Sequence, residues 1–204
     1  MIAVSPAQQP PLLLVHGLWD SLIRIDPLRE GLRRRGVERI HGFDLRPSNG
    51  RAPIVELSRQ VAAQADALRR ESGAPSIDIL GFSMGALAAR CYLQQGGGRE
   101  HVRRFISISG PHAGTWTAFA LPFAGVRDMR PQSALLRALE ADTNPFGTVE
   151  VHCIYTPFDL MIVPATSSVL PAAHSVHRVP IPLHRWMIRD PRVLDLAAQL
   201  LTRA

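Results

Sequence analysis

The chain has 204 residues, of which 46% are apolar, and this length and composition suit one domain with a substantial core. The formal net charge is +6 and every basic residue is arginine, but the arginine clusters lie in separate segments without a helix-turn-helix, RNP or zinc signature. We therefore expect no nucleic-acid partner. The longest apolar run is far shorter than the roughly 20 residues that span a bilayer, and no leader sequence is visible. We expect no membrane insertion and, for the sequence as given, a cytoplasmic location. The alternative is a secreted protein whose leader has been removed.

Short β-rich apolar runs alternate with longer segments of helical period. Most of these runs are dense in Leu, Ile and Val, which is typical of parallel strands buried on both faces. We predict six strands, at Leu12–His16, Arg39–Phe43, Ile77–Gly81, Arg103–Ser109, Val149–Tyr155 and Val176–Ile181. The alternation predicts an α/β fold, with a mostly parallel sheet of about six strands and helices on both faces.

Helix start and stop signals lie between these strands. Pro53 begins a segment whose apolar residues recur three and four positions apart until Gly73. Asp190 and Pro191 are typical of an N-cap and a first helical turn, and an apolar stripe follows them. Another helix is expected at Gln132–Glu140.

The longest stretch without a predicted strand is 110–148, which contains Trp116 and Phe119 among prolines and glycines. A loop this long in a small domain is usually functional or mobile. Within a single domain of residues 1–204, we interpret it as a lid or a pocket-lining insertion. The alternative is that its aromatic side chains only cover the edge of the sheet.

The pentapeptide Gly-Phe-Ser-Met-Gly at positions 81–85 follows a predicted strand and opens a helix rich in alanine. A nucleophile raised on a sharp strand-to-helix turn needs small neighbours on both sides, so this context is typical of a nucleophile elbow with Ser83 at its tip. The alternative is a glycine-flanked turn in which Ser83 only caps the helix.

A serine hydroxyl becomes nucleophilic when a histidine takes its proton. In enzymes with such an elbow the acid and then the histidine follow the serine along the chain, which leaves His152, His174, His177 and His184 as candidates. His152 and His177 fall in or beside predicted strands, whereas His184 follows the sixth strand. Reactive side chains of an open parallel sheet gather at the carboxyl ends of strands. We predict His184 as the base, with His174 as the alternative.

The same rule selects the acid that orients the histidine. Asp159 comes four residues after the predicted strand that ends at Tyr155. Asp142 precedes that strand, Asp190 has the position of a helix cap, and Asp195 lies on the last helix. We predict Asp159 as the acid.

A tetrahedral intermediate needs two backbone N–H donors for its oxyanion. One comes from the residue after the nucleophile, Met84, and the other from the loop after an early strand. Because the first apolar strand ends in His16-Gly17, we predict the N–H of Leu18 as the second donor.

Taken together, these motifs resemble the bacterial lipases and esterases of the α/β-hydrolase superfamily. The resemblance rests on Val15-His16-Gly17, the pentapeptide at 81–85, Ser-Gly-Pro-His-Ala-Gly-Thr at 109–115, Asp-Leu-Met-Ile-Val-Pro at 159–164, and His184. It implies a minimal six-stranded α/β-hydrolase fold, because the first strand begins near the start of the chain. It also implies hydrolysis of a carboxylic ester with an apolar acyl group through an acyl-enzyme, without a cofactor.

The resemblance also suggests residues near the substrate. In such lipases the segment that contains His112 borders the mouth of the site, so we interpret His112 as structural or pocket-lining and not as the base. Trp19 stands where small lipases often have small residues, and it is a candidate for the acyl pocket together with Trp116 and Phe119.

Two alternatives to ester hydrolysis use the same residues. An acyltransferase would pass the acyl group to a nucleophile other than water, and an amidase would take the acyl group from an amide. A non-catalytic binding module would keep only the fold. The sequence has no zinc, EF-hand or dinucleotide motif, so we expect neither a metal nor another cofactor. Cys91 and Cys153 are expected to be buried free thiols.

Overall fold

The computed structural model describes residues 9–203. Its strands are β1 (Leu12–Val15), β2 (Ile40–Gly42), β3 (Ile77–Phe82), β4 (Val102–Ile108), β5 (Glu150–Tyr155) and β6 (Ser175–Arg178). Its α-helices are α1 (Leu22–Arg33), α2 (Ile54–Ser72), α3 (Met84–Gln95), α4 (Ala124–Asp128), α5 (Ala134–Glu140) and α6 (Pro191–Thr202). Short 3₁₀ helices η2 (Gly98–Glu100), η3 (Trp116–Phe119), η4 (Ala165–Ser168) and η5 (His184–Ile188) connect them.

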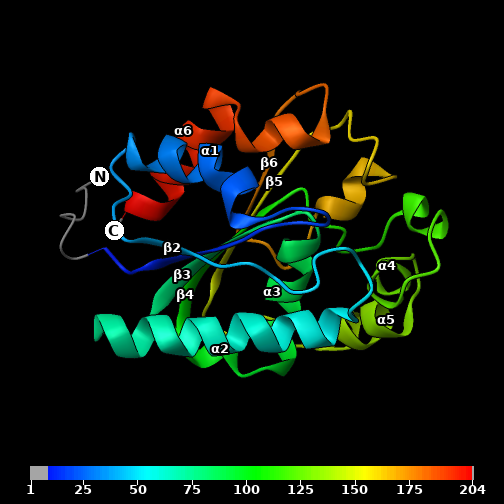
Figure 1. Ribbon diagram of the computed structural model, residues 1–204, viewed down its shortest axis with the longest axis horizontal. Helices are drawn as coiled ribbons and strands as arrows, with labels where there is room; N and C mark the ends of the chain where they lie inside the picture. The colour runs from blue at the N-terminus through cyan, green and yellow to red at the C-terminus, as the bar shows by residue number, and fades with distance from the viewer. Residues whose placement is uncertain (1–8, 204) are drawn as a thin grey trace.

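The six strands form one sheet in the order β2-β1-β3-β4-β5-β6, and every neighbouring pair is parallel. Helices α1 and α6 cover one face of the sheet, and α2 and α3 cover the other (Figure 1). Each face has its own buried apolar cluster. The α/β fold with a parallel sheet and helices on both faces is therefore confirmed.

The register aligns the carboxyl ends of the central strands. Val15 on β1 lies beside Gly81 on β3, and Ile108 on β4 lies between Phe82 on β3 and Ile154 on β5. The loops that follow β1, β3, β4 and β5 therefore begin at nearly the same level of the sheet. Segments far apart in the sequence meet at this edge.

The sixth strand and the first helix differ from the sequence prediction. Strand β6 ends at Arg178 and not at Ile181, because Pro180 has no N–H for a ladder hydrogen bond. The prediction assigns no element between β1 and β2, where the structure has α1 with Pro27 inside it. This helix forms because Ser21 caps it and because its buried face packs against α6, where Gly31 lies against Leu194.

Two further expectations concern burial and membranes. Cys91 and Cys153 are both buried free thiols, as predicted. Within residues 9–203, no helix combines the length and the apolar character that crossing a bilayer requires.

The close packing of β3 against α3 gives a test of the fold. A Cβ on Gly81 would lie 2.6 Å from the backbone Cα of Ala86, whereas a Cβ on Gly73 would meet nothing within 4 Å, although its φ of +63° is left-handed. Gly81→Ala should lower the free energy of unfolding by about 3 kcal/mol through overpacking. Gly73→Ala is the control. It should lower the free energy of unfolding by only about 1 kcal/mol, because its one penalty is the left-handed backbone conformation of an alanine. Equal losses in urea denaturation would contradict the packing described here.

Candidate active site

Ser83 lies at the tip of a sharp turn between β3 and α3. Its backbone has φ 55° and ψ −127°, a conformation that L residues rarely adopt. The turn is held in place because the N–H of Ser83 donates to the carbonyl of Ile108 at 2.9 Å. A side chain at Gly85 would clash with the carbonyl oxygens of Val15 and His16, so glycine lets the first turn of α3 rest on the end of β1. The pentapeptide therefore forms a sharp strand-to-helix turn with Ser83 at its tip.

Asp159 is buried in the loop after β5 and contacts His184. One carboxylate oxygen, Oδ1, accepts hydrogen bonds from the N–H groups of Met161 and Ile162, each at 2.9 Å. The other oxygen, Oδ2, lies 2.7 Å from Nδ1 of His184. Because a carboxylate only accepts, the Nδ1–H of His184 donates to it. The Nε2 atom of the ring is then free to accept a proton.

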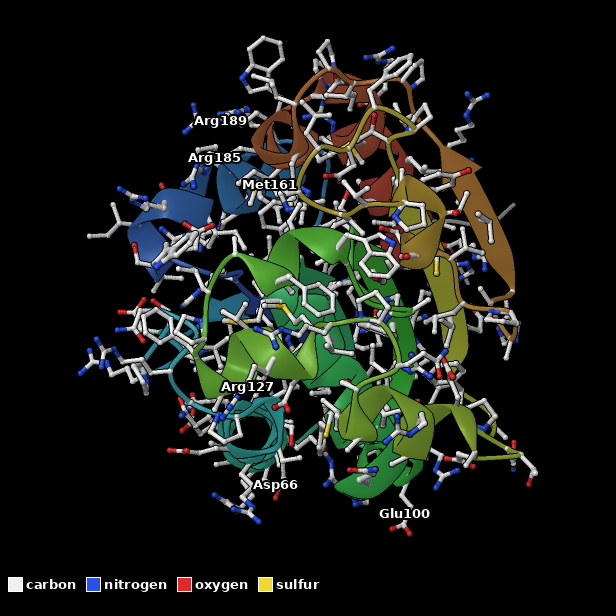
Figure 2. All side chains as sticks on the ribbon, turned by 90° about the vertical axis from the view of Figure 1, so that its right-hand side faces the viewer. Asp66, Glu100, Arg127, Met161, Arg185 and Arg189 are labelled. Carbon is white, nitrogen blue, oxygen red and sulfur yellow. The ribbon has the colours of Figure 1, made fainter. Side chains whose placement is uncertain are left out.

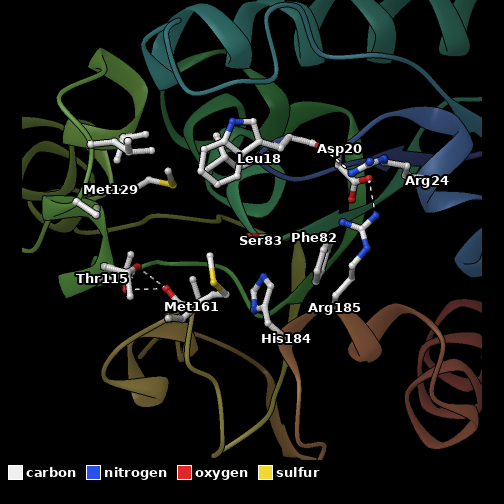
Figure 3. Close-up of a pocket in the computed structure, with 17 residues that line it drawn as sticks. Leu18, Asp20, Arg24, Phe82, Ser83, Thr115, Met129, Met161, His184 and Arg185 are labelled. Atoms are coloured by element: carbon white, nitrogen blue, oxygen red, sulfur yellow. Dashed lines mark hydrogen bonds and ion pairs between the residues drawn. The ribbon is translucent and has the colours of Figure 1, made fainter.

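His184 is the first residue of η5. Its imidazole ring packs on the ring of Phe82, with the two ring centroids 4.9 Å apart. Its side chain is 11% exposed, so the ring is held against the protein and still reaches a surface cavity. Ser83 and His184 line the same cavity, and Figure 3 shows both at its centre. In the structure, His184 contacts Asp159 and lines one cavity with Ser83. The catalytic roles of these three residues remain predictions.

The cavity has a volume of about 470 Å³. Its wall is mostly apolar and comes from loops at the carboxyl edge of the sheet, the edge that faces the viewer in Figure 2. The lining residues that come from the segment 110–148 are Thr115, Thr117, Ala118, Ala120, Leu121, Val126 and Met129. Part of this segment therefore lines the cavity.

The two predicted oxyanion donors, Leu18 and Met84, belong to segments that lie next to Ser83. A Cβ on Gly17 would lie 3.0 Å from the Cβ of Ser83, so the loop after β1 passes directly against the serine, and Leu18 lines the cavity. Met84 is the first residue of α3, where helical N–H groups have no intrahelical acceptor. Nε2 of His16 accepts a hydrogen bond from the N–H of Leu45 at 2.9 Å, which fixes the loop.

The four candidates for the acyl pocket lie in different environments. Trp19 lines the cavity and is half exposed, with a left-handed φ of 53°. His112 is buried away from the lining, and its Nε2 lies 2.7 Å from Oγ of Ser107. Trp116 and Phe119 stack on each other on the outer side of η3, because residues three apart lie on one side of a 3₁₀ helix. These last three therefore lie outside the cavity wall.

Sequence reasoning missed several lining residues. Met161 and Ile162 follow Asp159 directly, and Arg185 follows His184, so adjacency to the predicted residues was a usable signal. Met129 and Arg24 had no such signal, because tertiary packing brings them to the cavity from α4 and α1.

The histidines and carboxylates considered as alternatives in the sequence analysis have structural partners. His152 hydrogen-bonds with Ser175 at 2.7 Å, and Nδ1 of His174 accepts from the N–H of Val151 at 3.1 Å. Asp142 pairs with Arg99, Asp195 with Arg35, and Asp190 caps α6. None of the residues named here as alternatives lines the cavity that contains Ser83.

Comparison with known proteins identifies a family and a fold. The family model described as palmitoyl protein thioesterase matches residues 11–158 of the chain. No curated protein matches the sequence significantly. The matched range contains Ser83 and ends one residue before Asp159.

Solved structures of lipases have the same fold. Aspergillus fumigatus lipase B superposes with a TM-score of 0.84 at 18% identity, over 98% of this chain and 56% of that one. Bacillus licheniformis lipase BlEst2 superposes with a TM-score of 0.81 at 16% identity in its propeptide form, over 98% of this chain and 51% of that one. The mature form of the same lipase superposes with a TM-score of 0.80 at 15% identity, over 99% of this chain and 98% of that one. The chain thus spans about half the length of the first two structures.

Two buried histidines predict how stability depends on pH. Burial and the charge of Arg203 lower the pKa of His152 to about 4, and burial beside Arg90 lowers the pKa of His112 well below its usual range. The unfolded chain therefore binds more protons than the folded one, and stability should fall as the pH drops below about 6.5. His152→Gln should flatten the fall in stability between pH 6.5 and 4.5. A variant that keeps the full slope of the wild type in urea denaturation would contradict this origin.

Proposed function

The chain belongs to the palmitoyl protein thioesterase family, and from that premise we propose that it is a serine hydrolase that cleaves esters or thioesters of apolar acyl groups. The family and the lipase-like fold support ester hydrolysis at a general level. The observation that carries the finer proposal is the 2.7 Å contact between Asp159 and His184 beside a cavity that Ser83 also lines.

In the proposed mechanism, Oγ of Ser83 attacks the substrate carbonyl carbon while its proton passes to Nε2 of His184. Asp159 stabilises the imidazolium, and the N–H groups of Leu18 and Met84 hold the oxyanion. The bond to the leaving oxygen or sulfur breaks, and the leaving group takes the proton from His184. Water then attacks the acyl-serine, gives its proton to His184, and releases the carboxylic acid as Ser83 regains its hydrogen.

The acyl group fits the apolar part of the cavity. Its wall there includes Leu121, Val126, Met129, Met161 and Ile162, and the hydroxyl groups of Thr115 and Thr117 beside them already donate to the carbonyl of Met161. The substrates of choice are therefore acyl groups without polar substituents.

The roles of the three side chains are tested by substitution. Ser83→Ala and His184→Ala should each lower kcat for p-nitrophenyl butyrate and for the matching butyryl thioester on the order of 10⁴-fold. Asp159→Asn should also be severely impaired, because the tautomer of His184 would no longer be fixed. As a control, Ser109→Ala removes a buried hydroxyl outside the cavity lining and should keep most activity. More than a tenth of the wild-type rate in Ser83→Ala or His184→Ala would end the assignment.

The acyl side of the cavity is tested with a panel of esters from acetate to palmitate. Met129→Trp should fill the cavity and lower kcat/KM for acyl chains of eight carbons or more at least tenfold relative to acetate. Leu160→Trp is the matched control, because Leu160 is 73% exposed and does not line the cavity. An unchanged chain-length profile in Met129→Trp would show that the acyl chain lies elsewhere.

A further inference from the structure

The cavity has two chemically different sides, with Ser83 between them. Figure 3 shows Met129 and Met161 on one side and Asp20, Arg24 and Arg185 on the other. The apolar side comes from η3, α4 and the loop after β5, whereas the charged side comes from the start of α1 and from η5. A substrate with an alkyl chain alone would leave the charged side unused.

The charged side carries more positive than negative charge. Asp20 is buried, and its Oδ1 accepts from the N–H of Ser21 at 3.1 Å and from Nη2 of Arg185 at 3.3 Å. Nη1 of Arg24 donates to the carbonyl of Trp19 at 3.3 Å, and no carboxylate of the described residues forms an ion pair with it. Two guanidinium groups therefore face the cavity against a single carboxylate. Each guanidinium has five donors, so both retain N–H groups for a ligand.

The direction of proton transfer decides which part of the substrate lies here. The leaving group must take its proton from His184, so it lies beside that ring, and Arg185 is the next residue along η5. The acyl chain then occupies the apolar side. Asp20 holds Arg185 in this position through their ion pair.

We propose that Arg24 and Arg185 bind an anionic group, a carboxylate or a phosphate, on the alcohol or thiol that leaves. This inference rests on the proposed hydrolytic function and deepens it by naming the substrate class. Arginine forms paired hydrogen bonds with both kinds of anion. Because the side chain of Arg185 is 43% exposed, solvent and salt will weaken the attraction, and we expect a preference of about tenfold.

The test uses pairs of butyryl thioesters in which the leaving thiol of one member carries an anionic group and that of the other is neutral. One pair is 3-mercaptopropionate against 3-mercaptopropionamide, and the other is 2-mercaptoethyl phosphate against 2-mercaptoethanol. Release of free thiol gives kcat/KM for each, and the readout is the ratio of the anionic to the neutral member. The wild type should give a ratio of about ten in at least one pair, and the pair with the larger ratio identifies the preferred anion. The ratio should fall in 0.5 M salt.

Arg24→Gln and Arg185→Gln should each bring the ratio toward one. Arg189→Gln is the matched control, since Arg189 follows η5 and lies outside the cavity lining, and it should keep the wild-type ratio. If the loss of Arg185 releases Asp20 and unfolds the protein, Arg24→Gln still carries the test, because Arg24 is exposed on α1.

The outcomes separate this inference from the proposed function. Cleavage that depends on Ser83 with both ratios near one would overturn the anionic subsite and leave the hydrolase intact. A high ratio that survives in both arginine variants, or a glutaryl thioester cleaved faster than a butyryl one with the same neutral thiol, would also overturn it. No cleavage of any thioester or ester would remove the proposed function and this inference with it.

Discussion

The whole site depends on backbone segments that approach one another more closely than side chains would allow. Glycine at 17, 81 and 85 lets the end of β1, the end of β3 and the first turn of α3 meet around Ser83. A methyl group at any of these positions would meet backbone atoms or the serine itself. Because the register of the parallel sheet brings these strand ends to one level, the serine is raised at the edge where the other loops converge.

Hydrogen bonds through Asp159 connect His184 to the wall of the cavity. The N–H groups that hold Asp159 belong to Met161 and Ile162, which also line the cavity. The carbonyl of Met161 accepts from the hydroxyl groups of Thr115 and Thr117 at 2.9 and 2.7 Å, which ties the loop after β5 to the insertion after β4. The orientation of His184 and the shape of the apolar side are thus coupled. A change in the loop would therefore alter the position of His184 and the shape of the cavity together.

The sequence was sufficient for features whose signals are local or that follow from strand order. Buried strands, the glycine-flanked serine and the helix caps each have local signals. The carboxyl-end rule selected Asp159 and His184, whose side chains are in contact, while their roles remain predictions. Helix α1 was missed because Pro27 hides its pattern and because packing on α6 stabilises it. Trp116 and Phe119 have aromatic side chains of the kind that line apolar pockets, but the side of η3 that carries them faces outward. The charged side of the cavity joins Asp20 to Arg185, 165 positions apart, and no local pattern predicts that pair.

The most direct test of the account is to trap the covalent intermediate. The enzyme is mixed with a slowly cleaved acyl thioester, quenched in acid within milliseconds, digested, and analysed by mass spectrometry. The account predicts one added acyl group, on the peptide that contains Ser83, with a rise and decay that match the turnover rate. An acyl group on another residue, or steady turnover without any acylated peptide, would contradict it.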